Sequence, residues 1–152
     1  MLHLIPPSLH RLLYRVAHGV RSRWLNLVGG RVMGVSIVAR DKDGRVLMVR
    51  HSYGRHTWEF PGGGIGHQED AETAARREFA EELGCELKSL VFLGEVEEPF
   101  HGAINVVKVF SAVLDGRPRV DGRELIEVRF FAPGELPALS DNARRRLALA
   151  GI

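Results

Sequence analysis

Cysteine is almost absent from this chain, and the one thiol it has, Cys85, excludes both an internal disulfide and a zinc site built on several cysteines. The 152 residues are 45% apolar and 26% charged. That composition excludes a disordered chain, a collagen-like repeat and a disulfide scaffold, and the length fits one domain. A single cysteine is compatible with a reducing compartment, and we expect a cytoplasmic protein.

Acidic residues are absent from the first 40 positions. Residues 1–60 carry ten Arg or Lys against three Asp or Glu, whereas residues 61–152 carry eleven against sixteen. The net charge of +2 therefore hides a basic front and an acidic rear. A basic front could face phosphates, nucleic acid or an anionic membrane, or it could simply balance the acidic surface.

Residues 1–30 lack the long apolar run of a secretory signal or a membrane span. Apolar residues recur there at helical spacing, which predicts an amphipathic helix over residues 9–25 (Leu9, Leu12, Leu13, Val16, Ala17, Val20 and Trp24). Three uses stay open: packing on its own domain or on a dimer partner, lying on a membrane surface, or acting as a mitochondrial-type presequence. We favour packing, with 1–30 as a helical extension, 31–152 as the main domain and no stable membrane anchor.

Strand and helix patterns alternate after residue 30. Strands are predicted over residues 32–38, 46–49, 87–96, 104–114 and 125–131, with a hairpin turn at 41–44. Helices are predicted over residues 70–83, ended by Gly84, and from a cap at Ser140 through Leu149. Residues 51–69 hold so many glycines and prolines that no regular element is expected there. This order predicts an α+β fold, a mixed sheet covered by helices on both sides.

Three glutamates share one face of the predicted central helix: Glu78, Glu81 and Glu82 stand at i, i+3 and i+4. Carboxylates this close repel one another, and two of them lie at the helix end that disfavours negative charge. A divalent metal such as Mg²⁺ or Mn²⁺ would relieve the repulsion. The alternative is a solvated acidic face paired with Arg76 and Arg77.

A glycine-rich loop precedes this helix, and loops of this kind let backbone groups approach metal or phosphate. Together the loop and the acidic face indicate metal-assisted chemistry on a phosphoanhydride or phosphoester.

The spacing of these residues closely resembles the Nudix box, G-x5-E-x7-R-E-U-x-E-E-x-G-U, in which U is apolar. The matching positions are Gly63, Glu69, Arg77, Glu78, Phe79, Glu81, Glu82, Gly84 and Cys85. The segment 58–64, Trp-Glu-Phe-Pro-Gly-Gly-Gly, also resembles the approach to the box in this family. The resemblance covers residues 31–149.

The resemblance implies an α/β/α sandwich that uses Mg²⁺ or Mn²⁺ to hydrolyse nucleoside diphosphates linked to another group. It implies three carboxylate metal ligands, Glu78, Glu81 and Glu82, and a backbone ligand at Gly62 or Gly63. It makes Arg77 the residue that orients a helix carboxylate, with Glu81 as the expected partner, and Glu69 a support for the loop or an outer ligand. The base that deprotonates water is then a box glutamate or an acid of a later loop, for which Glu124 is the choice and Asp121 the second.

Other residues are weaker candidates. Gly63, Gly64, Arg50 and Trp58 are predicted substrate contacts, although a core role for Trp58 competes with stacking on a base. Arg144–Arg146 is predicted to be a solvated helix face.

We therefore predict a Nudix pyrophosphohydrolase acting on a small nucleotide-type substrate, with no nucleic-acid partner; a homodimer stays open. The first alternative is a non-catalytic Nudix domain that senses a nucleotide or binds a partner. The second is an RNA- or membrane-associated protein acting through the basic N-terminal helix, which lacks the aromatic and basic interleaving of an RNA-binding module.

Overall fold

The computed structural model describes residues 30–52, 55, 57–66, 68–120 and 125–152. The predicted helix over residues 9–25 lies outside this part. The elements in chain order are β1 (Arg31–Arg40), β2 (Val46–His51), β3 (Gly62–Gly64), α2 (Ala71–Leu83), β4 (Glu86–Phe100), β5 (Ala103–Asp115), β6 (Leu125–Phe131), a 3₁₀ turn (Pro133–Glu135) and α3 (Asp141–Leu149). Neither described helix is long and apolar enough to cross a membrane.

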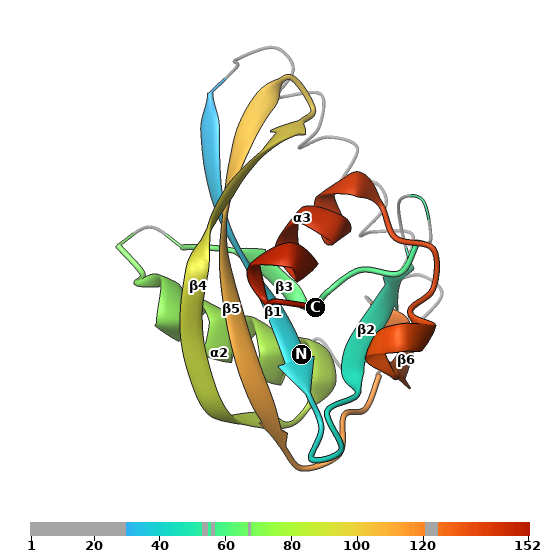
Figure 1. Cartoon of the computed structure of the whole chain (residues 1–152). Helices are drawn as coiled ribbons and strands as arrows, with labels where there is room; N and C mark the ends of the chain where they lie inside the picture. Colours follow the sequence, from blue (N-terminus) through green and yellow to red (C-terminus); the bar gives the residue numbers. More distant parts are fainter. Residues whose placement is uncertain (1–29, 53–54, 56, 67, 121–124) are drawn as a thin grey trace.

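The strands form one sheet in the order β4-β5-β1-β2-β6, and β3 pairs with β1 outside this path. β1 and β5 run parallel along their length, from Arg31 opposite Ile104 to Arg40 opposite Val113. The other described pairs are antiparallel. Figure 1 shows α2 and α3 on opposite sides of this sheet. The predicted mixed sheet with helices on both faces is confirmed.

Two strands divide the second edge of β1. β2 pairs with it only at the hairpin, where Arg40 lies opposite Val46, and β3 pairs with residues 34–36. The amide of Ile37 donates to the carbonyl of Pro61 at 2.9 Å and ties the approach to β3 in place. The expectation of no regular element in residues 51–69 is therefore wrong for three glycines, because a backbone ladder needs no side chains.

Each inner strand sends alternate side chains to the two faces, as a half-buried strand must. In β1, Val35 and Ile37 join the core under α2, whereas Val38 joins the core under α3. The helices complete the two cores with Ala74, Ala75, Phe79 and Leu83 from α2, and with Ala143 and Leu147 from α3. The sheet is thus buried on both sides, which makes it a rigid support for the loops at its edge.

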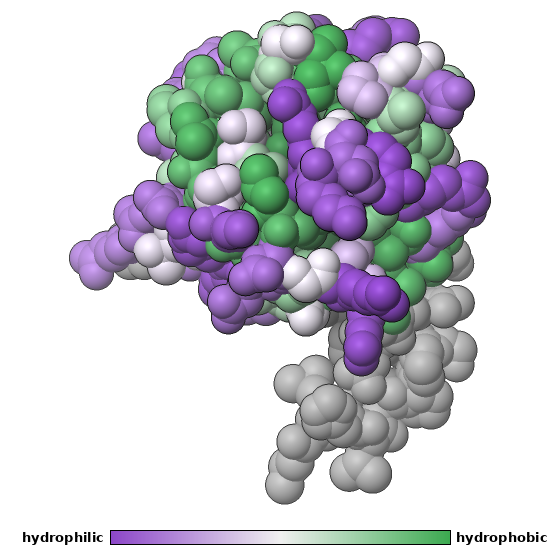
Figure 2. All heavy atoms as spheres, turned by 60° about the horizontal axis from the view of Figure 1, so that its bottom comes forward, coloured by the Kyte–Doolittle hydropathy of each residue, from purple (hydrophilic) through white to green (hydrophobic). Residues whose placement is uncertain are grey.

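Some apolar surface stays open to solvent. The exposed large apolar residues of the described part are Met33, Val91, Phe92, Ile104, Val113 and Leu149. Figure 2 shows apolar patches between polar ones on the face that it draws. The surface therefore leaves area that a partner could cover.

Candidate active site

Helix α2 begins and ends where the sequence predicts. The carboxylate of Asp70 accepts from the amide of Thr73 at 3.0 Å, which satisfies one of the free donors of the first turn. Gly84 ends the helix in the left-handed conformation, at φ 62°, and its amide donates to the carbonyl of Ala80. These two ends fix which face of the helix meets the glycine-rich loop.

The three box glutamates differ in exposure. The side chain of Glu81 is 62% exposed, that of Glu78 is 17% exposed, and Glu82 is buried. The acidic face therefore runs from solvent at Glu81 to the buried contact between the helix and the loop. A carboxylate in such a gradient can be reached by a ligand from one side while the protein holds it from the other.

Gly63 lies directly against the carboxylate of Glu78. A Cβ atom added at Gly63 would stand 2.4 Å from the carboxylate carbon of Glu78, so no larger residue fits without moving that side chain. At the neighbouring Gly64 an added Cβ would meet nothing within 4 Å. The close contact between the loop and Glu78 thus requires glycine at position 63 but not at position 64.

Glu82 joins helix and loop from the buried side. Its Oε2 accepts a hydrogen bond from the amide of Gly62 at 3.1 Å. Gly62 itself has no room for a side chain, because a Cβ would come 2.1 Å from the carbonyl oxygen of Val35. Gly62 is therefore packed directly between the backbone of β1 and the carboxylate of Glu82 on α2.

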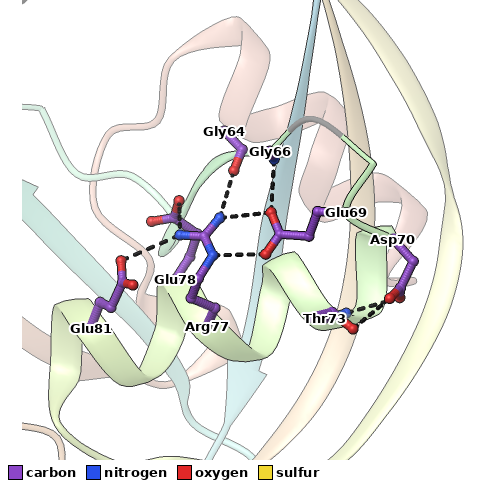
Figure 3. A network of polar contacts seen from close by, with 8 residues as sticks. All are labelled: Gly64, Gly66, Glu69, Asp70, Thr73, Arg77, Glu78 and Glu81. Carbon is purple, nitrogen blue, oxygen red and sulfur yellow. Dashed lines mark hydrogen bonds and ion pairs between the residues drawn. The ribbon is translucent and has the colours of Figure 1, made fainter.

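Arg77 lies at the centre of a polar network (Figure 3). Its Nε and Nη2 donate to the two oxygens of Glu69 at 2.8 and 3.0 Å, and Nη2 also donates to the carbonyl of Gly64 at 3.0 Å. Nη1 donates to Glu78 at 2.8 Å and to Glu81 at 3.3 Å. The structure brings the predicted partner Glu81 to Arg77, but the shorter contacts are those to Glu69 and Glu78. Glu69 also accepts from the amide of Gly66 at 2.7 Å, in keeping with its predicted support of the loop.

These contacts and the burial of the site shift the pKa values of three of its charged groups. The hydrogen bonds to Glu69 and then Glu78 raise the pKa of Arg77, and the hydrogen bond from Arg77 lowers the pKa of Glu69. The pKa of Glu78 is raised although it shares the same ion pair, because burial outweighs the guanidinium. Burial of Glu78 thus disfavours its negative charge even though Arg77 lies beside it.

The donor set fits a hard divalent cation in kind. Glu78, Glu81 and Glu82 offer carboxylate oxygens, and the glycine loop lies against Glu78 in a cradle that a Cβ would fill. Within the described ranges, however, no three His, Cys, Asp or Glu side chains form a group that could hold a metal ion. Arg77 supplies the nearby positive charge instead, on Glu78 and Glu81.

A cavity of about 690 Å³ adjoins the loop. Its wall includes Gly62, Gly63 and Gly64, and it continues over the start of β1 to the end of β4 and to α3. A volume of this size accommodates a nucleoside-sized group. The three glycines thus line the cavity, and two of them, Gly62 and Gly63, also contact the carboxylates of α2.

The remaining predicted site residues lie elsewhere or outside the described part. Arg50 pairs with Glu127 at 2.6 Å and stacks on Trp58, 5.2 Å from the ring centroid. Trp58 is half-buried and packs edge-on against Phe131 at 5.1 Å. Arg50 and Trp58 are not among the described residues that line the cavity, and their contact with substrate stays a prediction.

The predicted bases Glu124 and Asp121 lie outside the described residues. On one side of residues 121–124, the amide of Arg119 donates to the carbonyl of Leu83 at the end of α2. On the other side, Leu125 pairs with His51, which lines the cavity. The role of Glu124 stays a prediction.

One feature of the site was missed in the sequence. Arg146 was expected on a solvated face, but its side chain is 15% exposed and forms a two-point ion pair with Glu98, whose side chain is 3% exposed. Both residues line the cavity. The sequence gives only a partial indication of this burial, because Arg146 lies one residue before the apolar Leu147. Its partner Glu98 is 48 positions away, so the spacing of residues cannot predict the pair.

Comparison with known proteins agrees with this geometry. The sequence model of the NUDIX domain family matches residues 30–150. An RNA pyrophosphohydrolase of Sodalis glossinidius is 48% identical over 59 residues, which are 39% of this chain and 33% of that protein. An RNA pyrophosphohydrolase of Serratia proteamaculans is 46% identical over 59 residues, which are again 39% of this chain and 33% of that protein. The chain thus spans about a third of the length of these curated relatives.

Two solved structures share the fold. A MutT NUDIX hydrolase of Burkholderia pseudomallei aligns with a TM-score of 0.72 and 28% identity, covering 78% of this chain and 97% of that one. The Bacillus subtilis pyrophosphohydrolase BsRppH, in a mutant form, aligns with a TM-score of 0.64 and 25% identity, covering 79% and 81%. The family match over most of the chain, with the box residues gathered around the glycine loop, shows that this protein belongs to the Nudix family.

Proposed function

We propose that the chain is a metal-dependent hydrolase that cleaves the diphosphate linkage of a nucleoside diphosphate joined to another group. One observation carries the proposal: the glycines of β3 line a nucleoside-sized cavity, and Gly62 and Gly63 also contact the carboxylates of α2. A substrate whose nucleoside fills the cavity would extend its phosphates past these glycines to the acidic face.

Glu78, Glu81 and Glu82, with the backbone carbonyl of Gly62 or Gly63, would hold Mg²⁺ or Mn²⁺. When bound, the cation lowers the charge of the diphosphate and makes a water molecule a better nucleophile. Arg77 holds Glu69, Glu78 and the carbonyl of Gly64 in one arrangement, so it positions the loop relative to the carboxylates. The amide of Gly62 fixes Glu82 in the same way.

The reaction needs a group that accepts a proton. A water oxygen forms the new bond to phosphorus, the bridging P–O bond breaks, and the water proton passes to a carboxylate. We assign this role to a box glutamate or to Glu124. Support for Glu124 comes from its position in sequence, one residue before Leu125, which pairs with cavity-lining His51.

Several chemical groups are candidates for the group joined to the nucleoside diphosphate. The curated relatives are named for RNA as substrate, but they share only a 59-residue segment with this chain. We expect a small nucleotide derivative and include 5′-triphosphorylated RNA as a competing substrate.

The test is hydrolysis by the full-length protein with Mg²⁺ and, separately, with Mn²⁺. The panel contains nucleoside triphosphates, dinucleotide polyphosphates, nucleotide sugars and a 5′-triphosphorylated RNA oligonucleotide, with products separated by chromatography. We expect cleavage of a diphosphate linkage that stops on addition of a chelator. Nucleotide binding without any hydrolysis across the panel would favour the non-catalytic sensor instead.

A further inference from the structure

The buried ion pair between Glu98 and Arg146 is the most unusual polar feature of the cavity wall. It joins β4 to α3, and the two charged groups are almost removed from solvent. Burying charges is costly unless their geometry is excellent, and apolar residues of the same volume often stabilise a fold as well. A pair retained at the wall of a ligand cavity therefore calls for an explanation beyond fold stability.

The geometry of the pair leaves one edge of the guanidinium unused. Nε donates to Oε1 of Glu98 at 2.8 Å, and Nη2 donates to Oε2. This side-on arrangement takes two of the five N–H donors of arginine. Among the described residues nothing accepts from Nη1, so the end-on edge formed by Nη1 and the second N–H of Nη2 stays available.

We infer that this edge faces the cavity, because Arg146 lines the cavity together with Asn142, which precedes Arg146 by one helical turn on the same face of α3. The carboxylate of Glu98 prevents the guanidinium from turning, since rotation would leave a buried charge unpaired. Arg146 is thus held in a fixed orientation before any ligand enters.

The charge of the pair indicates the kind of ligand group. Glu98 cancels the positive charge of Arg146, so the edge favours a neutral acceptor over a phosphate. Two parallel N–H donors match two adjacent acceptors, and among the nucleobases guanine offers such a pair in O6 and N7, whereas adenine offers an amino donor beside N7.

We propose that Arg146, held by Glu98, is a specificity-determining residue that selects guanine over adenine in the cavity. The proposal rests on the proposed function for the presence of a nucleotide. Glu98 is the positioning residue, because both of its carboxylate oxygens accept from Arg146 and it acts through that guanidinium.

The experiment is calorimetric titration of the full-length protein with guanosine 5′-monophosphate and adenosine 5′-monophosphate, without metal. We expect the wild type to bind the guanosine compound at least about tenfold more tightly, within the usual discrimination of a two-point arginine contact. In Arg146→Lys the charge stays but the planar fork is lost. We expect its preference to fall to within about twofold while adenosine binding stays unchanged.

Arg144→Lys is the matched control. Arg144 lies on the same helix, is 63% exposed and pairs with Asp141, so its replacement should leave the guanosine preference as it is. If Arg146→Lys is unfolded, the double variant Glu98→Gln/Arg146→Gln removes both charges together and keeps polar groups at both positions.

Two results would overturn the assignment: a wild type without preference for guanosine, or a preference that survives in Arg146→Lys or in the double variant. Because binding is measured without hydrolysis, failure of this assignment can be distinguished from failure of the proposed function. A protein that selects guanosine but hydrolyses nothing keeps the role of Arg146 and loses the catalytic proposal; one that hydrolyses diphosphates without base preference does the opposite.

Discussion

Arg77 explains how two of the three helix carboxylates, Glu78 and Glu81, lie close together on one face of α2. Its guanidinium contacts Glu78 and Glu81 and also holds Glu69 and the carbonyl of Gly64 (Figure 3). The repulsion that the sequence implies is therefore relieved by an arginine of the same helix. Lysine could not replace it, because the two-point contact with Glu69 and the contact with the loop need the planar fork.

Glu82 is the sharpest single test of the metal site. Glu82→Gln keeps the volume and an oxygen that can accept from the amide of Gly62, but it removes the negative charge. We expect hydrolysis to fall by at least about 10²-fold, as for loss of a strong charge interaction in the transition state, with the fold retained. The measurement is turnover at saturating Mg²⁺, with circular dichroism to check the fold.

The matched control for Glu82 is Glu72→Gln. Glu72 lies on the same helix, is exposed and pairs only with Arg76 in the described structure, so turnover should stay within about twofold of wild type. Near-wild-type turnover in Glu82→Gln would remove Glu82 from the ligand set.

Gly63 and Gly64 form a natural pair for a second test. Gly63→Ala places a methyl group 2.4 Å from the carboxylate carbon of Glu78 and must displace that side chain, whereas Gly64→Ala meets nothing. We expect at least about tenfold lower turnover from Gly63→Ala, and more from Gly63→Val, with an unchanged circular dichroism spectrum. Equal activity of the two alanine variants would show that the loop is only a connector.

At the scale of elements, the left-handed end of α2 predicts a pure backbone effect. Gly84 has φ 62° and open space around an added Cβ, so Gly84→Ala should destabilise the protein by about 1 kcal/mol through strain alone. Urea unfolding measures it. Gly134→Ala, where no positive φ is found and nothing lies near the added Cβ, should change the free energy of unfolding by less than about 0.5 kcal/mol.

The sequence predicts well those features that are set by near neighbours. The ends of α2 and α3, the hairpin turn at Asp41 and the span of β6 follow from caps, turn residues and alternation, and the structure confirms them. It predicts poorly what distant segments decide. β3 exists because β1 supplies its ladder, and Arg146 is buried because Glu98 comes to it from another strand. The sequence predicts the carboxylate cluster of α2. The hydrogen bonds of Arg77 to Glu69 and Glu78 depend also on the conformation of the glycine-rich loop.

At the scale of the molecule, the parallel pair of β1 and β5 places the candidate site. β1 carries β3 on one edge and β5 on the other, and β5 carries β4. The cavity therefore extends from the glycine loop across β1 and β5 to the end of β4. Helix α2 then supports the loop from one face of the sheet, and α3 closes the cavity from the other (Figure 1). We therefore expect a change in the packing of α3 to alter the affinity for substrate more than the rate of the chemical step at α2.

The segment before Gly30 gives the last prediction. The apolar stripe that the sequence predicts there is too large to leave in water, since burial of each large side chain contributes about 1.5–3 kcal/mol. The chain enters the sheet at Gly30, whose carbonyl accepts from the amide of Ile104 at 2.8 Å, and exposed apolar residues lie on the sheet nearby. We expect a protein surface, of its own domain or of a second copy, to cover the stripe.

A chain that starts at Arg31 should then unfold at a lower temperature or aggregate, as followed by calorimetry and light scattering. Its remaining soluble fraction should still hydrolyse substrate, because every residue of the Nudix box is retained. The matched comparison is binding of both proteins to anionic liposomes. If the shortened protein is monodisperse and as stable as the full-length one, and only the full-length protein binds the liposomes, then the stripe covers lipid and the packing prediction is wrong. A full-length dimer that becomes a stable monomer on shortening would instead assign the stripe to the subunit interface.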